Sequence, residues 1–404
     1  MNNDVMILAE NKYYSLDCFK TKLNNNVIAV GTSGAGKTRC LVEPNILQAV
    51  GSYIISDPKG NLYEKYKSYL SKKGYRVIKL DFTNPKNSEK YNFFKYIHSP
   101  LDILKISNIL IYQSGRSTFH DPYWDRASQI LIQSLIGFLI EQCREEDMTL
   151  ENIFRLIDEF NIDEDNSSNK TLLDELFEDL EKDNHNSYAV KAYKKFRCAP
   201  GKTLKCIVST LNATLGSYDT PEINEMLSKD TIDISSIGCK KTALFVVVSD
   251  IDRSMDGLAN IFFTQALSEL LRYADNECKN NMLPIPTRFI LDDFATNVRI
   301  NDFPRMISSI RSRRISAMIM IQSESQLMET YHYDGNTIIS NCDTYIYMGG
   351  NDIETARAIS LRCDIPLKKI LLMPVGTNWI FRRGQEPVNA RNFDIDNHAD
   401  LIYT

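Results

Sequence analysis

The chain has 404 residues, which is enough for one large domain or two medium ones with a substantial hydrophobic core. Its hydrophobic content of 43% and charged content of 25% are ordinary for a globular protein, and its net charge of −5 excludes a surface that is basic throughout. Any contact with nucleic acid must therefore be local, in a loop or in the lining of a ring.

The cysteines and the apolar stretches argue against a zinc-binding protein and against a protein that spans the membrane. The nine cysteines form no C-x-x-C pair and the five histidines show no metal-ligand spacing, so we expect reduced thiols and no zinc site. The longest apolar stretches, 130–140 and 243–248, are far shorter than the ~20 residues of a membrane-spanning helix. From the residues before Gly31, which contain no basic region followed by an apolar one and are only about thirty in number, we expect no signal peptide and no N-terminal membrane anchor. We therefore expect a cytoplasmic protein without a membrane span of its own.

The first functional motif lies between a predicted strand at 26–30 and a predicted helix at 39–50. Every fixed position of G-x-x-x-x-G-K-[ST] is filled by Gly31-Thr32-Ser33-Gly34-Ala35-Gly36-Lys37-Thr38. The backbone N–H groups of such a loop form a cradle for nucleotide phosphates, Lys37 reaches the β- and γ-phosphates, and the Thr38 hydroxyl holds Mg²⁺. The alternative is a glycine-rich turn that binds nothing. Pro44 falls inside the predicted helix and should kink or shorten it.

A second polar motif follows the next predicted strand, at 52–56, and precedes another strand at 75–80. Asp57-Pro58-Lys59-Gly60 comes directly after 52–56, so a carboxylate and an ammonium group are expected beside the phosphate loop. A Pro-Gly turn with a solvated lysine is the alternative.

Strand patterns are missing between residues 100 and 217, where we expect an all-helical insertion. Apolar residues recur at helical spacing in 125–143 and 172–180, with a polar loop at 161–170 and a break at Pro200-Gly201. The acidic run 174–183 is interpreted as a solvated helix face. A basic stretch without acidic residues contains Lys191, Lys194, Lys195, Arg197, Lys202 and Lys205. It is either a contact site for a nucleic-acid backbone or a solvated basic helix.

The last third of the chain returns to apolar strands, at 243–249, 288–291, 316–321 and 344–348. Near-continuous apolar strands that alternate with helices predict an α/β fold with a mostly parallel sheet covered on both faces. The strand at 288–291 ends in Asp292 and Asp293, at the edge of the sheet that faces a ligand. With an upstream phosphate loop, Asp292 is predicted to hold Mg²⁺ through water, and Asp293 to orient and deprotonate the attacking water.

Two further polar features accompany the strand at 316–321. Gln322 ends it and is placed to contact the γ-phosphate or the attacking water. Arg311 to Arg314 precede it, and they supply either an arginine finger across a subunit boundary or a solvated basic turn.

Together these motifs resemble the type IV secretion coupling proteins of the TraG/TraD class, which are hexameric RecA-like ATPases of conjugation. The resemblance runs from about residue 6 to 385. Besides the phosphate loop and the segment 24–27 before it, it rests on Asp57-Pro58-Lys59-Gly60, Asp121-Pro122-Tyr123-Trp124-Asp125 with Gln129, Leu291-Asp292-Asp293-Phe294, 311–313, 321–323, 325–327, Asn341-Cys342-Asp343-Thr344 and Thr355-Ala356.

The resemblance implies a RecA-like P-loop NTPase with a nucleotide-binding domain in two parts, 1–99 and 218–404, and an all-α domain at 100–217. It implies that residues 31–38, Asp57 and Lys59 bind ATP and that Thr38 and Asp292 hold Mg²⁺. It also implies that Asp293 acts in hydrolysis with Arg311, the preferred arginine finger, and Gln322, the sensor. The implied function is an ATPase that recruits and translocates a relaxase–DNA complex or a protein substrate into a secretion channel. Such an ATPase works as a homo-hexamer, with DNA, the relaxase and channel components as partners.

Two features depart from that family. Its members carry N-terminal transmembrane helices, so we expect this chain to be either a soluble variant, held at the inner face of the membrane by a partner, or a shortened form. Asp293 also replaces the catalytic Glu of the family and is one methylene shorter. Since a misplacement of about 1 Å costs on the order of a hundredfold in rate, we expect slow hydrolysis that DNA or assembly stimulates.

Two other functions stay open. One is a nucleotide-gated module that docks substrates without motor activity. The other is a DNA-pumping ATPase outside secretion, against which the all-helical insertion argues.

Overall fold

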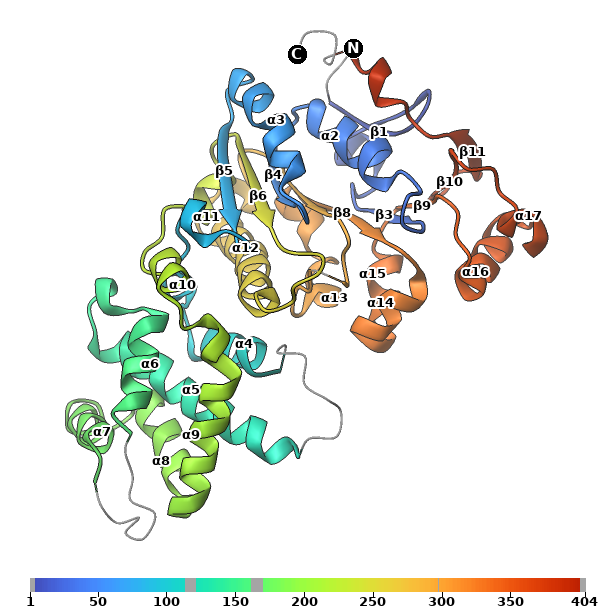
Figure 1. Cartoon of the computed structure of the whole chain (residues 1–404). Helices are drawn as coiled ribbons and strands as arrows, with labels where there is room; N and C mark the ends of the chain where they lie inside the picture. Colours follow the sequence, from blue (N-terminus) through green and yellow to red (C-terminus); the bar gives the residue numbers. More distant parts are fainter. Residues whose placement is uncertain (1–3, 113–120, 161–169, 297, 400–404) are drawn as a thin grey trace. The chain divides into compact units, whose positions relative to one another are not determined.

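The computed structural model describes residues 4–112, 121–160, 170–296 and 298–399 (Figure 1). By packing, the chain divides into two compact units. Unit 1 comprises Met1–Asp81, Asp233–Ile251 and Ala266–Thr404, and unit 2 comprises Phe82–Ile232 and Asp252–Gln265. The sequence predicts domain boundaries at other residues, with domains at 1–99, 100–217 and 218–404. That domain organisation stays a prediction.

A nine-stranded sheet forms the centre of unit 1, in the order β11-β10-β9-β3-β8-β7-β4-β6-β5. The strands from β9 to β5 pair in parallel, whereas β10 is antiparallel to both of its neighbours. Their bounds are β3 Val27–Val30, β4 Ser52–Ser56, β5 Arg76–Asp81, β6 Thr242–Val247, β7 Thr287–Leu291, β8 Ile315–Ile321, β9 Thr344–Tyr347, β10 Thr377–Arg382 and β11 Val388–Arg391. The strands predicted from apolar runs are therefore all present, with ends that shift by one or two residues.

The sheet is buried on both faces, as its continuous apolar strands predict. Every residue of β3, β4, β6, β7 and β8 is buried. On one face, alternate side chains such as Ala29, Ile55 and Phe245 belong to a core that also contains Leu41 and Leu70 from the helices above them. This burial fixes the register of the strands, because a slip by one residue would exchange the two faces.

Short helices and one hairpin complete unit 1. The hairpin strands are β1 Val5–Ala9 and β2 Lys12–Ser15. The helices are α1 Cys18–Thr21, η1 Thr38–Val42, α2 Glu43–Leu47, α3 Asn61–Lys72, α11 Ile234–Ile237, α13 Phe303–Met306, η7 Ile310–Arg313, α14 Glu324–Tyr331, α15 Gly335–Ser340, α16 Ile353–Cys363 and α17 Leu367–Leu371. Helix α12, Asp256–Glu277, contributes residues to both units.

The described residues of unit 2 form helices joined by loops and turns, without a strand, as expected for the central region. Its helices are α4 Pro100–Tyr112, α5 Pro122–Gln142, α6 Leu150–Asp158, α7 Leu172–Asp183, α8 Tyr188–Arg197, α9 Gly201–Leu215 and α10 Pro221–Met226. Pro200 lies between α8 and α9, so the predicted helix break is confirmed. The polar loop predicted at 161–170 lies outside the described residues except for Lys170.

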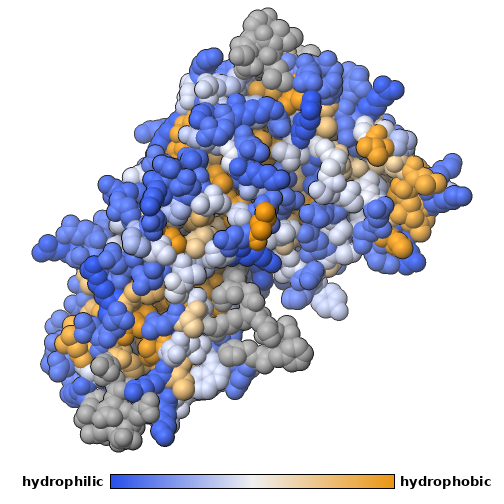
Figure 2. Space-filling view, in the orientation of Figure 1, coloured by the Kyte–Doolittle hydropathy of each residue, from blue (hydrophilic) through white to orange (hydrophobic). Residues whose placement is uncertain are grey.

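Most of the surface seen in Figure 2 is hydrophilic, and one of its apolar patches lies over α16 and α17. The exposed apolar side chains of this region are Ile353, Leu361, Leu371, Leu372 and Val375. Across the described ranges, we find no helix with the length and apolar character needed to span a bilayer.

Candidate nucleotide-binding site

The phosphate loop, residues 31–37, follows the carboxyl end of β3 in the middle of the sheet. The N–H of Gly31 donates to the carbonyl of Ile321 at 3.2 Å, and the N–H of Thr32 donates to the carbonyl of Gly349 at 3.1 Å. These acceptors lie at the ends of β8 and just beyond β9, the strands that flank β3. The loop is thereby fixed at the carboxyl edge of the sheet, where open α/β sheets bind ligands.

The backbone of this loop leaves donors available for an anion. Gly34 and Gly36 have φ of 79° and 89°, a conformation that favours glycine. Among the described residues, the N–H groups of Ser33, Gly34 and Gly36 donate to no backbone carbonyl, whereas the N–H of Ala35 donates to Thr32. Three unpaired donors in one short loop fit a phosphate group, as the motif predicts.

The helix after the loop begins as a π-helix. In η1 the N–H of Glu43 donates to the carbonyl of Thr38, five residues earlier. Pro44 follows immediately and has no N–H to continue the helical ladder, which accounts for the wider turn at this point. The helix then ends at Leu47, three residues before the predicted end at Val50, so the prediction that Pro44 kinks or shortens it is confirmed.

The predicted metal ligands lie next to each other. Thr38 Oγ1 donates to Asp292 Oδ2 at 2.5 Å, and Ser56 Oγ donates to the Asp292 carbonyl at 2.9 Å. Asp292 is buried, and burial raises the pKa of its carboxyl group, as does the charge of Asp293. A hydroxyl and a carboxylate that converge beside a phosphate loop are the oxygen donors that Mg²⁺ takes when phosphates and water complete its shell.

Thr38 and Asp292 alone do not form a metal site in which the protein supplies all of the ligands. Within the ranges that the structure describes, no group of three or more His, Cys, Asp or Glu side chains is arranged to hold a metal ion. A metal at Thr38 and Asp292 would therefore depend on the nucleotide for its remaining ligands.

Lys37 lies within the loop that it is predicted to serve. Its Nζ donates to the carbonyls of Gly31 at 2.5 Å and Thr32 at 3.1 Å. The side chain is buried, and burial lowers the pKa of its ammonium group. The negative charges of Asp293 and Asp292 raise this pKa, but by less than burial lowers it. The structure thus brings together the lysine, the hydroxyl and both carboxylates named from the sequence.

Asp293 occupies an unusual backbone position directly after β7. Its φ is 50°, in the left-handed region that Asp tolerates better than most residues. The N–H of Asp293 donates to Asp292 Oδ1 at 3.1 Å, and the N–H of Phe294 donates to the Met320 carbonyl at 2.9 Å. These bonds hold the turn that presents Asp293 beside Lys37.

The other predicted ATP-binding residues, Asp57 and Lys59, make different contacts. Buried Asp57 accepts a 2.9 Å hydrogen bond from the N–H of Tyr63 at the start of α3, and burial raises the pKa of its carboxyl group. Exposed Lys59 forms a 3.6 Å ion pair with Asp250. The described contacts join neither of them to residues 31–38, so their role at the nucleotide stays a prediction.

Gln322 and Arg311 lie at opposite ends of β8. Gln322 directly follows Ile321, whose carbonyl accepts the Gly31 N–H, so it is next to the phosphate loop. Arg311 is in η7 before the strand, is exposed, and donates to the Cys18 carbonyl at 3.3 Å. A strand of seven residues spans roughly 23 Å, so Arg311 does not reach the loop of its own chain.

Two contacts to the loop region were not predicted from the sequence. Asn392, just after β11, donates to the Ala35 carbonyl at 3.3 Å, and Asp396 pairs with Arg39 at 3.0 Å. In each of these two contacts the partners are 357 positions apart in the sequence. No local sequence pattern indicates either contact.

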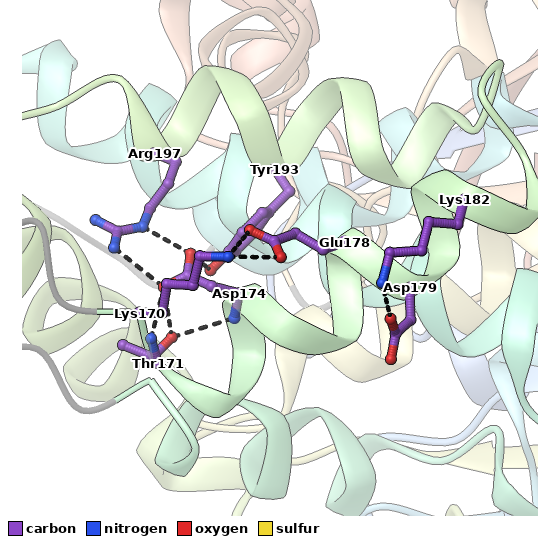
Figure 3. Close-up of polar contacts among 8 residues, drawn as sticks. All are labelled: Lys170, Thr171, Asp174, Glu178, Asp179, Lys182, Tyr193 and Arg197. Carbon is purple, nitrogen blue, oxygen red and sulfur yellow. Dashed lines mark hydrogen bonds and ion pairs between the residues drawn. The ribbon is translucent and has the colours of Figure 1, made fainter.

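In unit 2 the acidic run is not entirely a solvated face. Asp174 is buried, and Figure 3 shows Arg197 and Tyr193 pointing toward its carboxylate. Arg197 Nε and the Tyr193 hydroxyl donate to Asp174 Oδ1 at 2.7 and 2.8 Å, while Thr171 forms a capping box with it. Burial alone would raise the pKa of Asp174, but Arg197 and the other donors outweigh it and lower the pKa. For Asp174 the solvated interpretation is wrong, because its carboxylate is buried and partly buried Arg197 compensates its charge.

The basic stretch divides into paired and unpaired cations. Arg197 is bound to Asp174 and Lys194 pairs with Glu181. Lys195 and Lys202 pair with no carboxylate among the described residues, nor does Arg126 on α5. A cavity of about 450 Å³ brings Arg126 and Lys195 together with the aromatic rings of Tyr123 and Phe196 and the carboxylate of Asp121.

Comparison with known families gives one extended match. The model of the family described as Type IV secretory system Conjugative DNA transfer matches residues 4–364, which include every candidate residue of the nucleotide site except Asn392 and Asp396.

Curated relatives agree with this match. Protein VirD4 of Rhizobium radiobacter is 24% identical over 352 residues, covering 82% of this chain and 47% of that protein. Conjugal transfer protein TraG of Escherichia coli is 21% identical over 355 residues, covering 83% of this chain and 54% of that protein. The chain thus spans about half the length of the curated relatives that it matches.

A solved structure shares the fold. The plasmid coupling protein TrwB in complex with ADP and Mg²⁺ matches with a TM-score of 0.67 at 14% identity, covering 96% of this chain and 89% of that chain. The α/β fold with a mostly parallel sheet, predicted from the sequence, is therefore confirmed.

Proposed function

This chain belongs to the family of type IV secretory system proteins for conjugative DNA transfer, and from that premise we propose that it is an ATPase coupling protein of such a system. The observation that carries the proposal is the 2.5 Å contact between Thr38 Oγ1 and Asp292 Oδ2 at the mouth of the phosphate loop. It joins the two halves of a P-loop nucleotide site, which bind triphosphate and Mg²⁺ together.

In the proposed site each residue has a distinct task in binding. The N–H groups of Ser33, Gly34 and Gly36 hold the phosphates, and Lys37 exchanges its two loop carbonyls for phosphate oxygens. Thr38 and Asp292 would hold Mg²⁺, which when bound neutralises charge on the β- and γ-phosphates. Asp57 and Lys59 are proposed to border the phosphates, a role that their present contacts do not require.

Hydrolysis is proposed to depend on residues around the γ-phosphate. Asp293 orients and deprotonates the attacking water, and Gln322 contacts the water or the γ-phosphate. Because Asp293 is one methylene shorter than glutamate, turnover is expected to be slow without DNA or assembly. Turnover measured with and without single-stranded DNA tests this, since fast hydrolysis that ignores DNA would contradict it.

Arg311 is proposed to act in a neighbouring subunit of a homo-hexamer. It lies at the end of β8 away from the loop, so only a second copy can bring it to the γ-phosphate. An arginine finger in trans neutralises charge in the transition state. The apolar patch of α16 and α17 offers surface that assembly can bury. Mass determination with a non-hydrolysable ATP analogue, with and without single-stranded DNA, tests ring formation.

The DNA contact of unit 2 is proposed to lie at Arg126, Lys195 and Lys202. These cations lack a carboxylate partner among the described residues, and Tyr123, which lines the same cavity as Arg126 and Lys195, presents an aromatic face on which a base can stack. Lys195→Gln and Arg126→Gln should each weaken binding of oligothymidylate and lower the salt slope by about 1. Lys194→Gln is the matched control, because Lys194 is on the same helix and already pairs with Glu181.

The wider role follows from the family. We propose that the protein works at the inner face of the membrane through partner subunits and passes a relaxase–DNA complex or a protein substrate to the channel. A docking module without motor activity is the second candidate, favoured by the short side chain of Asp293. DNA transfer in cells carrying Asp293→Asn or Arg311→Ala distinguishes the two. Loss of transfer while nucleotide binding survives supports the motor, and intact transfer supports docking.

A further inference from the structure

One side-chain amide reaches the phosphate loop from outside the motif. Asn392 follows β11, and its Nδ2 donates to the Ala35 carbonyl at 3.3 Å. The same nitrogen lies 3.6 Å from the position that a Cβ on Gly36 would occupy. Asn392 therefore lies directly against the Ala35–Gly36 peptide, in the middle of the loop.

Hydrogen bonds on its other side hold this amide in place. The backbone N–H of Asn392 donates to the Gly376 carbonyl at 2.8 Å, and its Oδ1 accepts from Asn378 Nδ2 at 2.9 Å. Asn378 is itself a buried residue of β10. Since the Ala35 carbonyl can only accept, the network assigns the NH₂ group of Asn392 to face it and Oδ1 to face Asn378. The sheet edge is thus connected to the loop through two amides.

The geometry of a peptide bond gives this contact a consequence for the nucleotide. The described residues contain no cis peptide bond, and in a planar trans peptide the C=O and the next N–H point in opposite directions. Asn392 holds the Ala35 carbonyl on the side of the carboxyl-terminal segment, so the N–H of Gly36 points to the other side. That N–H has no backbone acceptor in the described part of the chain.

We propose that Asn392 is a positioning residue of the nucleotide site, which presets the Gly36 N–H as a donor to phosphate. The inference rests on the proposed nucleotide function. Glycine at a φ of 89° has wide conformational freedom, so a peptide next to Gly36 needs an external contact to keep one orientation. Fixing the donor before binding removes part of the ordering cost of the complex.

The test compares two asparagines at the same edge of the sheet, in the full chain. Asn392→Ala removes the donor to Ala35, whereas Asn389→Ala removes an exposed amide that donates only to the Asn378 carbonyl at 3.3 Å. Calorimetric binding of Mg-ADP and thermal unfolding without nucleotide are measured for both. Asn392→Ala should raise the Kd about tenfold, the worth of one such hydrogen bond, while Asn389→Ala leaves it unchanged.

Unfolding separates positioning from support of the fold. Asn392→Ala also leaves the Nδ2 of buried Asn378 without its acceptor, so its nucleotide-free unfolding temperature should lie somewhat below that of Asn389→Ala, and affinities are compared at a temperature where both variants are fully folded. Asn392→Asp should bind more weakly than Asn392→Ala, because it turns a carboxylate toward the Ala35 carbonyl and the phosphates. Unchanged affinity in Asn392→Ala, an equal loss in Asn389→Ala, or a loss explained by a lower unfolding temperature would overturn the inference. If the wild-type chain binds no Mg-ADP, the proposed nucleotide function fails first and the inference with it.

Discussion

The Thr38 hydroxyl donates to the Asp292 carboxylate at 2.5 Å although 254 positions separate the two residues. Thr38 is placed by the loop after β3, and Asp292 by the carboxyl end of β7, two strands away in the sheet. The parallel pairing of β3, β8 and β7 aligns these ends, so the contact is a direct product of the sheet.

Removing the Asp292 charge should stabilise the nucleotide-free protein. Burial raises the pKa of this carboxyl group, so its ionised form destabilises the fold. The destabilisation is complete above the folded-state pKa and disappears as the pH falls through that pKa toward the ordinary value of 3.8. Asp292→Asn should therefore be more stable by roughly 1 kcal/mol at pH 7, with a smaller gain in acid, and should lose Mg-dependent nucleotide binding. Chemical denaturation at two pH values checks this, and lower stability at pH 7 would contradict it.

Lengthening Asp293 should raise the rate of hydrolysis. Asp293→Glu extends the carboxylate by one methylene toward the water and is expected to speed phosphate release about tenfold. Asp293→Asn removes the base and should slow it on the order of a hundredfold or more. At a φ of 50° a glutamate is less favourable than aspartate, so the faster variant should also be slightly less stable. Steady-state phosphate release with single-stranded DNA present gives the rates, and equal rates in all three proteins would refute a role for Asp293.

Arg311→Ala should separate binding from hydrolysis. Nucleotide affinity is expected to stay at the wild-type level, because Arg311 does not reach the loop of its own chain. Hydrolysis by the assembled protein should fall about a thousandfold. Arg313→Ala is the control, since Arg313 already pairs with Asp275 at 2.9 Å. Rates measured over a range of protein concentrations check the prediction, and a loss in the control alone would assign the role to Arg313.

The ion pair between buried Asp174 and partly buried Arg197 should stabilise unit 2 more than the surface ion pairs of this unit do. Arg197→Gln leaves the Asp174 carboxylate buried without its guanidinium partner, which should cost about 3 kcal/mol at pH 7. The pKa of Asp174 is lowered in the fold, so this stability is present above the ordinary value of 3.8 and is lost as the pH falls below it. Lys182→Gln, which breaks an exposed pair with Asp179, should change stability by less than about 0.5 kcal/mol. Similar losses in both variants would contradict the burial argument.

The elements that the sequence predicted well are those set by consecutive residues. The phosphate loop can be recognised from the sequence of residues 31–38 alone, and the rule that parallel strands end at one edge then places Asp292 beside it. The buried strands consist of nearly continuous runs of apolar residues, and these runs made them predictable from the sequence. In β10, buried and partly buried side chains alternate, and no strand was predicted there.

The parts that were missed depend on partners distant in sequence. Nothing around Asn392 indicates that it will contact Ala35, because that contact is made by the antiparallel strands β10 and β11 folding back beside the loop. Asp174 looked solvated because its neighbours in the acidic run are charged, and its burial depends on Arg197, 23 positions later.

The most direct test of the account is the affinity of Lys37→Ala for Mg-ATP, measured at equilibrium beside the wild-type chain. Lys37 is a cation held inside the loop by the loop carbonyls, at 2.5 and 3.1 Å, so its loss should weaken binding roughly a hundredfold. Wild-type affinity in this variant would show that triphosphate is not held between the loop and Asp292.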